Sequence, residues 1–308
     1  MEAGARDFAS TYLVKQLDRV AFQVSTAIAR RDTEAIHDLR VAMRRFAQGL
    51  VVFRPHVGSR KPKKIRRALK QVMELAGAVR DYDVALGFVS KMGSPYAARL
   101  RKALGVERKN AERELIESLK HWVARKTSRK WREELEGAHF TRIPDELTPA
   151  EIAGGELPRM ATAFLAWGER AARTKSSAEE LHQFRLAAKK FRYTLEIFAV
   201  LYQQSIEMWL PLLKKVQQLL GRINDCSSFR RLLSRLGRHP KLEAQLKLKE
   251  RRRTAEFRRF WTREVSESAE IQQRVELLRQ PADSSRPLKR PAGRSLSSRG
   301  ELVLVAHA

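Results

Sequence analysis

The sequence predicts an all-α protein built from a duplicated helical bundle. Apolar residues recur every three or four positions with charged residues between them, which is the spacing of amphipathic helices. Glycine and proline are sparse from residue 6 to residue 278, and no segment alternates between apolar and polar residues as a half-buried strand would. Two blocks of the first half also reappear in the second half at nearly one offset, which indicates a duplication.

The periodicity divides the chain into helices separated by short breaks. The expected helices cover residues 7–31, 33–54, 61–76, 82–92, 95–135, 158–174, 178–202, 206–220, 226–237 and 240–279. Proline and glycine gather at 143–158, which indicates a linker over 141–157 between a first bundle at 7–140 and a second bundle at 158–280. The segment 281–308 is rich in Pro, Ser and Arg and is expected to be a disordered basic tail.

The repeat centres on one helix of each half. Ile36–Arg40 aligns with Leu181–Arg185 at an offset of 145 residues, and Leu69–Asp81 aligns with Leu213–Asp225 at an offset of 144. Each of the two helices carries an apolar stripe that advances by three and four residues, as a core-facing stripe does. The stripes are Ile36, Leu39, Met43, Phe46, Leu50 and Phe53, and then Leu181, Phe184, Ala188, Phe191, Leu195 and Phe198.

A row of cationic residues lies beside each apolar stripe. Residues at positions i, i+3 and i+7 share one helix face, so one imidazole and two cations line up over about two turns. The first row is His37, Arg40 and Arg44, the second is His182, Arg185 and Lys189, and Arg45, Lys190 and Arg192 widen them. Cations so placed repel one another unless an anion lies among them. The alternative is that the arginines pair with buried carboxylates and that the histidines are satisfied residues at the edge of the core.

Other basic segments supply further candidates. The run over 60–70 contains no acidic residue, and a shorter basic segment occupies the equivalent place in the second half. The candidate binding residues from these two segments are Arg67, Lys70, Lys214 and Lys215. A third cluster, 247–259, holds seven cations and two acids but has no repeat counterpart. Each of these segments can also be read as a solvated helix face.

The motifs Gly77–Asp81 and Gly221–Asp225 are interpreted as breaks between helices. Glycine suits the left-handed residue that ends a helix, and aspartate suits the N-cap of the next helix. The second interpretation is that the aspartate orients a neighbouring arginine.

The net charge indicates a polyanionic partner. The chain has 62 Lys and Arg against 35 Asp and Glu, a net charge of +27. Residues 281–308 hold five cations and two acids, so they contribute +3 and the remaining chain carries +24. A body with this excess repels itself, and nucleic acid, an anionic membrane and inorganic polyphosphate are the candidate partners that would offset the repulsion. A basic surface that serves solubility alone is the alternative.

Several classes of protein are excluded or disfavoured. The single cysteine, Cys226, excludes an internal disulfide framework and a multi-cysteine metal site. The longest uncharged stretches, such as Ile197–Ile206, are too short to span a bilayer. The first residues show no signal-peptide pattern, so we expect a cytoplasmic protein.

The repeated motifs resemble the CHAD family, the conserved histidine α-helical domain. The segments that carry the resemblance are Ile36–Arg45, Val79–Asp83, Leu181–Tyr193 and Leu220–Asp225, and it extends over roughly 7–280. It implies two four-helix bundles related by a pseudo-twofold axis, with a basic central channel that binds inorganic polyphosphate, often on polyphosphate granules. It also implies that the channel is lined by His37, Arg40, Arg44, Arg45, His182, Arg185, Lys189, Lys190 and Arg192.

One position departs from the family pattern. Ala47 stands where the first repeat of the family often has an arginine, whereas the second repeat keeps its equivalent, Arg192. The channel is therefore expected to be asymmetric.

The Glu-x-Glu-x-Lys signature of the triphosphatase domain that accompanies some relatives is not found in the sequence. We expect a stand-alone binding module with no catalytic residues, metal or cofactor.

Three other functions remain open from the sequence. Nucleic-acid binding fits the charge, although no helix-turn-helix, zinc-finger or RNA-binding aromatic pattern is present. A metal-dependent hydrolase of polyphosphate or phosphate esters would need clustered ligands, and Asp81, Asp83 and Asp225 are the only acids linked to a motif. A membrane-surface role would need an amphipathic helix with a free apolar face, and the sequence shows none.

If His37 and His182 become charged around a bound anion, the affinity for that anion should rise as pH falls through the range where histidine titrates.

Overall fold

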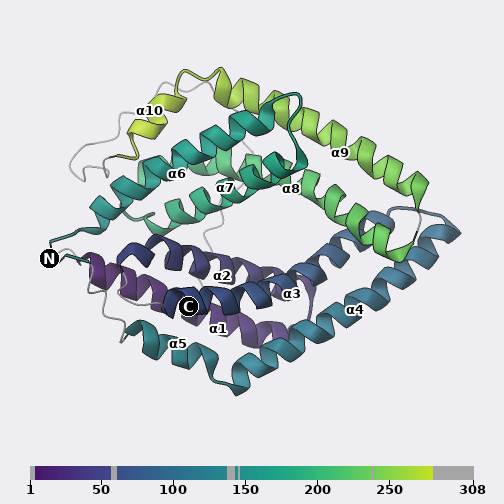
Figure 1. Ribbon diagram of the computed structural model, residues 1–308, viewed down its shortest axis with the longest axis horizontal. Coiled ribbons are helices and arrows are strands. Elements are labelled where there is room, and N and C mark those ends of the chain that lie inside the picture. Colours follow the sequence, from purple (N-terminus) through teal and green to yellow (C-terminus); the bar gives the residue numbers. More distant parts are fainter. Residues whose placement is uncertain (1–3, 57–60, 137–142, 145, 238, 280–308) are drawn as a thin grey trace, which may run out of the picture.

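The computed structural model describes residues 4–56, 61–136, 143–144, 146–237 and 239–279. Within these ranges the chain is all-α, with ten α-helices and no strand (Figure 1). The first half holds α1 (Ala5–Arg30), α2 (Thr33–Val52), α3 (Lys61–Val89), α4 (Pro95–Ala124) and α5 (Thr127–Glu136). The second half holds α6 (Pro149–Ala172), α7 (Ala178–Ile197), α8 (Gln203–Leu236), α9 (Pro240–Trp261) and α10 (Ile271–Glu276).

The helix starts follow from local capping. The Asp32 side chain accepts a hydrogen bond from the Ala35 amide at the start of α2, and Ser177 forms a capping box with Glu180 at the start of α7. A second capping box, between Thr148 and Glu151, starts α6 with a proline in its first turn. The expected helix start at residue 158 is therefore wrong, because the segment 149–157, assigned to a linker, is already helical.

The long helices α3 and α8 correct the interpretation of the two Gly-to-Asp motifs. Both helices run without a break through Gly77 and Gly221, so the expected breaks at 76–82 and 220–226 are absent and the capping interpretation is wrong. A Cβ atom on Gly77 would lie 3.1 Å from Nη1 of Arg40, so this glycine gives a neighbouring helix room for its arginine. The motif reflects close packing around a charged side chain and not a helix end.

Two expected helices are instead divided. The expected helix over 95–135 is split into α4 and α5 at Lys126, whose φ of +50° is left-handed. The expected helix over 240–279 is split into α9, a π-helical segment Thr262–Ser266 and α10. The expected tail at 281–308 lies outside the described residues.

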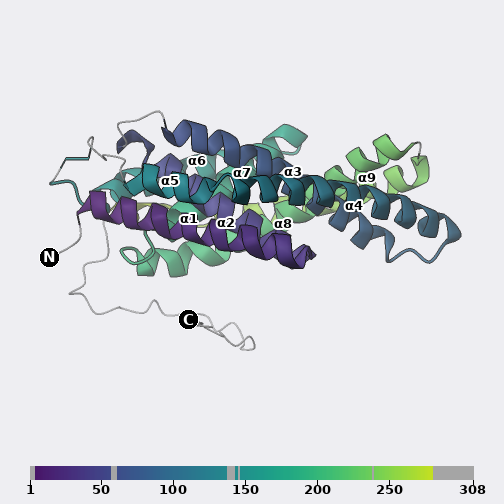
Figure 2. The same cartoon turned by 90° about the horizontal axis from the view of Figure 1, so that it is seen from below.

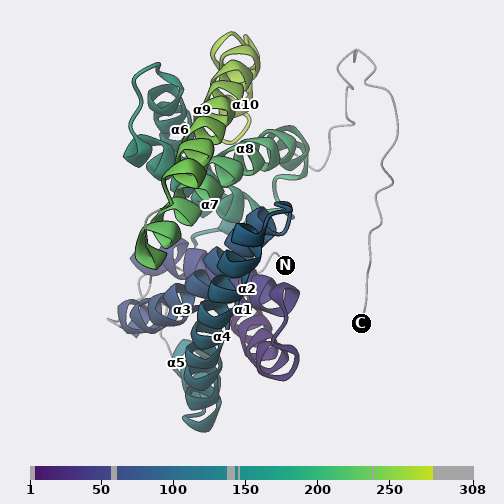
Figure 3. The same cartoon turned by 90° about the vertical axis from the view of Figure 1, so that its right-hand side faces the viewer.

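The helices pack in two groups that meet through equivalent members. In the first half α2 contacts α1 and α3, and α4 contacts α3 and α1; in the second half α7 contacts α6 and α8, and α9 contacts α8 and α6. Between the halves α1 contacts α6, α2 contacts α7 and α3 contacts α8. Figure 3 shows the two groups end-on, one above the other. Each of these three pairs joins helices that hold the same place in their own group.

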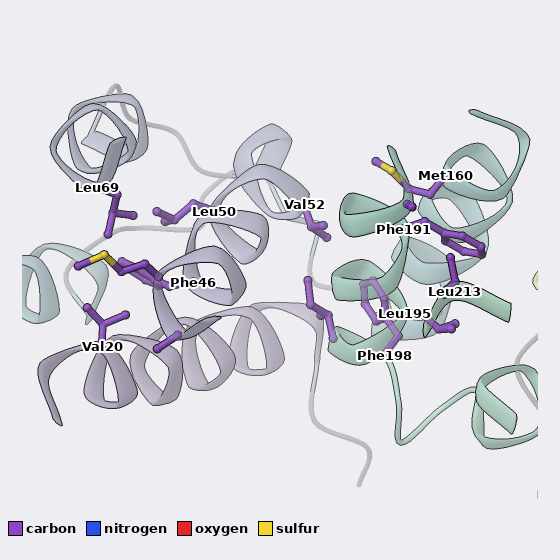
Figure 4. Close-up of a cluster of buried hydrophobic side chains, with 14 of the residues drawn as sticks. Val20, Phe46, Leu50, Val52, Leu69, Met160, Phe191, Leu195, Phe198 and Leu213 are labelled. Atoms are coloured by element: carbon purple, nitrogen blue, oxygen red, sulfur yellow. The ribbon is translucent and has the colours of Figure 1, made fainter. Parts of the chain in front are cut away.

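The main core follows the two expected apolar stripes. Every stripe residue of α2 is buried, and on the α7 stripe only Leu181 is half-buried. Figure 4 shows Phe46 and Leu50 in one half and Phe191 and Leu195 in the other, with Val52 between them. The halves meet through aromatic rings, since Phe198 stacks on Phe8 at 5.8 Å and meets Phe53 edge-on at 6.3 Å.

A second apolar cluster joins the halves at the far end of the molecule. It packs the C-terminal part of α3 and the start of α4 against the C-terminal part of α8 and the start of α9. The Phe88 and Phe229 rings stack there with centroids 5.5 Å apart. Figures 1 and 2 show the two helical hairpins converging at this end. The halves are therefore held together at two places along their length.

Candidate functional site

A cavity of about 770 Å³ lies between the two halves, with walls from α2, α3, α7 and α8. Along α3 its lining ends at Val84, just before the second apolar cluster, and along α8 the lining residues Ser228 and Arg231 alternate with residues of that cluster. The cationic residues of the lining are His37, Arg40, Arg44, Lys70, Arg80, Arg185, Lys189, Arg192, Arg222 and Arg231. The acidic residues of the lining are Glu74, Asp81 and Asp225. The cavity is therefore strongly basic.

The centre of the cavity combines the two predicted cationic rows. Arg40 and Arg44 come from α2, and Arg185 and Lys189 come from α7. All four are half-buried, because their row lies beside the apolar stripe that holds each helix in the core. These four residues are called the cation cluster below.

Within the part of the chain that the structure describes, no carboxylate lies at ion-pair distance from the cation cluster. Within the described residues, none of its four members forms an ion pair, and the one hydrogen bond found for Arg40 runs from its Nη1 to the Met73 carbonyl at 3.4 Å. The expectation that buried carboxylates pair with Arg40 and Arg185 is therefore not met at ion-pair distance. Partly buried like charges without partners are costly, so these four side chains repel one another.

The pKa values of the cluster record this repulsion. Burial, together with the Arg44 charge, lowers the pKa of Arg40 to about 10. The pKa of Arg185 is lowered by the same two causes in the same order. Burial lowers the pKa of Lys189 to about 6, helped by Arg44, Arg185 and Arg40. The pKa of Lys189 therefore lies far below the ordinary value for lysine, so its charge depends on pH near neutrality.

Two aspartates stand among these cations. Burial raises the pKa of Asp81, opposed by Arg231, Arg40 and a hydrogen bond with Ser228. Burial also raises the pKa of Asp225, opposed by Arg80 and Arg185. Each aspartate thus faces arginines from the other half of the molecule, which agrees with the second interpretation of the Gly-to-Asp motifs.

A smaller cavity of about 330 Å³ adjoins the first. Its walls come from α7 and α8 with one residue of α9, and it holds His182. The two cavities share Arg185, Asn224 and Arg231. The two repeated histidines are exposed and lie on different cavities, so they do not meet.

Comparison with known families and structures decides the family. The family model described as the CHAD domain matches residues 11–234, most of the described chain. The chain belongs to the CHAD domain family. No curated protein matches the sequence of this CHAD protein.

Two solved structures share the fold of this CHAD protein. The crystal structure of the CHAD domain from the plant Ricinus communis has a TM-score of 0.68 and 20% identity, covering 91% of this chain and 94% of that one. PptA from Streptomyces chartreusis has a TM-score of 0.59 and 16% identity, covering 89% of this chain and 100% of that one. At these identities the likeness shows the fold alone.

Two other predicted residues of the CHAD domain form an ion-pair network between the halves. Glu196 accepts from Nε of Arg192 at 2.8 Å and from Nε of Arg45 at 3.0 Å. Arg192 still lines the cavity and also donates to Oε1 of Gln217 at 3.1 Å. Arg45 is not part of the cavity lining. The Ala47 position leaves the first half without an equivalent of Arg192, as the sequence indicated.

The remaining predicted residues lie at or beyond the rim. Lys70 lines the cavity but is exposed, and its Nζ is 3.6 Å from Glu74. The residues that are exposed and line neither cavity are Arg67, Lys190, Lys214 and Lys215. Their part in binding stays a prediction.

Sequence reasoning missed three cavity arginines. Arg80 comes from α3, and Arg222 and Arg231 come from α8. Arg80 could have been predicted from the sequence if the helix had been continued through Gly77. In a continuous helix, Arg80 shares a face with Lys70, Gly77 and Asp81. The same helical period, continued through Gly221, reaches Arg231, but it gives no reason to choose Arg231 over other residues on that face.

No group of three or more potential metal ligands occurs within the described part of the chain. None of the helices in the described ranges combines the length and hydropathy of a membrane-spanning segment.

Proposed function

We propose that this CHAD protein binds inorganic polyphosphate in the basic cavity. The observation that carries the proposal is the cation cluster, whose four half-buried members have no ion pair within the described residues. Cations are rarely held together in this way unless an anion offsets their repulsion. A bound chain of phosphates would supply that anion.

The lining suits a phosphate polymer. Arginine presents a planar fork that matches two phosphate oxygens, and lysine adds a compact point charge. Polyphosphate has no bases to read, so recognition depends on charge and on hydrogen-bond donors. Release of condensed counterions would favour binding and make it sensitive to salt, by analogy with nucleic acids.

The arrangement of the halves supports a channel with two similar walls. The contacts between equivalent helices support a duplication, with a first bundle at 7–140, a second bundle that begins with α6 at Pro149 and not at residue 158, and a pseudo-twofold axis between them. The two adjoining cavities would form the channel, with Arg185, Asn224 and Arg231 between them. We place the protein in the cytoplasm, on polyphosphate granules where these are present.

Binding without catalysis is the activity that the site supports best. Asp81 and Asp225 each face arginines, which suits the orientation of donors better than the holding of a divalent cation. Hydrolysis would appear as phosphate release above a control without protein, lost in an Asp81→Ala variant.

Nucleic-acid binding is the second candidate, favoured by the net charge of +27. A duplex is too wide to enter a cavity of about 770 Å³, so it would bind the outer surface. The two candidates therefore depend on different cations.

The test is a titration with long-chain polyphosphate and with duplex DNA of matched charge, over a salt series. The cavity variant combines Arg40→Ala and Arg185→Ala, and the control variant combines Arg101→Ala and Lys102→Ala on α4, which removes the same charge outside the cavities. We expect selective binding of polyphosphate that the cavity variant loses by at least about a hundredfold and the control variant nearly keeps. Equal binding of both polymers with equal losses in both variants would contradict the proposal.

A further inference from the structure

The outer face of α9 is strongly basic. This helix lies at the outer edge of the second half (Figure 1), and Lys241, Arg252 and Arg259 share its solvent-facing row. Lys247 and Arg251 widen the row, and all five side chains are exposed. At 1.5 Å per residue the row extends about 27 Å from its first cation to its last. These five residues are called the α9 row below.

The acidic residues of α9 are fewer than its cations, and two of them pair with α8. Glu243, Glu250 and Glu256 are half-buried as residues, although the Glu256 side chain is 46% exposed. Glu250 accepts from Nη1 of Arg230 at 2.9 Å and from the Ser227 hydroxyl at 2.7 Å. Glu256 lies 3.7 Å from Nη1 of Arg222. Glu250 and Glu256 therefore pair with arginines of α8, and the exposed charge of α9 is cationic apart from the partly exposed Glu256 side chain.

A belt of cations connects the α9 row to the cavity. Arg222 lines the cavity, and Arg253 of α9 donates to its backbone carbonyl at 2.5 Å. Arg253 and Lys249 both lie over the Phe88 ring, with their charged groups 5.7 and 4.9 Å from its centroid. Lys249 is exposed and stands between Arg253 and Arg252 around the helix. The cations thus continue from the cavity edge to the outer face.

We propose that the α9 row is a second binding surface for the same linear phosphate polyanion, occupied by the part of a long chain that extends beyond the cavity. The proposal rests on the proposed function. It assigns a role to the basic cluster at 247–259, which has no repeat counterpart. It also predicts that the protein prefers long chains to short ones.

The features of the row favour a single flexible polyanion over other partners. The cations follow one helix in a narrow line, which a single strand of phosphates can track without deformation. Leu248 is the one large apolar residue exposed on α9, so the helix lacks the apolar face that inserts into a membrane surface. The row also lacks aromatic residues on which bases would stack.

The test compares two variants that lose the same charge. The α9 variant changes Lys241, Lys247, Arg251, Arg252 and Arg259 to glutamine. The control variant changes five exposed cations of α4, the equivalent helix of the first half, namely Arg99, Arg101, Lys102, Lys109 and Arg113. The probes are tripolyphosphate, long-chain polyphosphate and duplex DNA, each titrated over a salt series.

We expect the α9 variant to bind long-chain polyphosphate about tenfold more weakly, with a salt dependence that falls by about three to five ion equivalents. Its affinity for tripolyphosphate should match the wild type, because the cavity is intact. The α4 control should keep most of its affinity for both probes. This pattern would separate the α9 row from a general effect of net charge.

Two results would overturn the proposal. Equal affinity of the α9 and α4 variants for long-chain polyphosphate would remove the row as a specific surface. A loss confined to duplex DNA would assign the row to nucleic acid. Failure of the proposed function is distinguishable, since the Arg40→Ala, Arg185→Ala variant would then still bind tripolyphosphate like the wild type.

Discussion

The helices α2 and α7 hold equivalent places in the two halves but supply the cavity with different kinds of charge. Arg40 and Arg185 occupy the same repeat position and lie half-buried at the cavity. Four residues further on, α2 has Arg44, whereas α7 has Lys189, whose pKa is lowered to about 6. The first half therefore contributes fixed charge, and the second half contributes a charge that depends on pH and on the ligand.

The glycines of α3 and α8 that line the cavity also differ between the halves, in how closely other side chains approach them. A Cβ atom at Gly77 would meet the Arg40 guanidinium, whereas no atom lies within 4 Å of the Cβ position at Gly221. The first half thus packs its arginine tightly against α3, and the second half leaves open space. The comparison teaches that a duplicated site can keep its charge pattern while its halves diverge in titration and in packing.

The largest expected effect is a difference in the loss of polyphosphate affinity between Arg44→Ala and Lys189→Ala. At pH 8 Lys189 is mostly neutral before a ligand binds, because its pKa is lowered to about 6, so binding must protonate the lysine before it contributes. Arg44→Ala should weaken binding of long-chain polyphosphate by about ten- to a hundredfold at pH 8, and Lys189→Ala by clearly less. The difference between the affinity losses of the two variants should be smaller at pH 6. Equal losses at pH 8 would show that the two halves contribute alike.

The pH dependence of binding sharpens the same contrast. A phosphate chain favours the charged form of Lys189, so binding takes up a proton at pH values above the pKa of about 6 in the free protein. The affinity for polyphosphate should rise by up to about tenfold per pH unit as the pH falls from 8 to 6. Below pH 6 the protonation of Lys189 should give no further increase in affinity. Asp81 and Asp225, whose pKa values are raised by burial, change affinity in the same direction when they become protonated.

Lys189→Arg isolates the lysine from the aspartates and histidines. The arginine stays charged, so the variant should bind more tightly than the wild type at pH 8 and show a shallower slope between pH 8 and pH 6. Calorimetry in two buffers of different ionisation enthalpy would count the protons taken up. An unchanged proton count in the variant would remove Lys189 from the pH response.

A smaller effect is expected from the two glycines. Gly77→Ala should weaken binding of polyphosphate a few-fold, because the new methyl group displaces the Arg40 guanidinium from its position 3.1 Å away. Gly221→Ala meets open space, so it should leave affinity unchanged and stabilise α8 by about 0.5–1 kcal/mol. Thermal unfolding and titration of both variants check this. A loss of affinity in both variants, or in neither, would contradict the packing difference.

The sequence predicted the parts of the site that local periodicity determines. The apolar stripes of α2 and α7 are buried as expected, and the cations beside them meet at the cavity. Local pattern could not show that α3 and α8 continue through Gly77 and Gly221, because glycine followed by aspartate is also typical of a helix break. The continuous helices bring in Arg80, Arg222 and Arg231.

Contacts between the halves could not be predicted for a different reason. The pairing of Arg45 with Glu196, and the apolar cluster around Phe88 and Phe229, depend on how α2 meets α7 and how the two hairpins converge. Nothing in the local sequence of Lys190 shows that it faces solvent while its repeat equivalent Arg45 pairs across the halves. Such assignments require the tertiary arrangement.

The central claim is that the cation cluster is held together for a ligand and not for the fold. Thermal unfolding of Arg44→Gln, with and without long-chain polyphosphate, tests it most directly, and Lys102→Gln on α4 is the exposed control. Removing Arg44 relieves repulsion of Arg40, Arg185 and Lys189, so the variant should melt above the wild type without polyphosphate and gain much less on adding it. A variant that melts below the wild type and keeps the full stabilisation by polyphosphate would contradict the account.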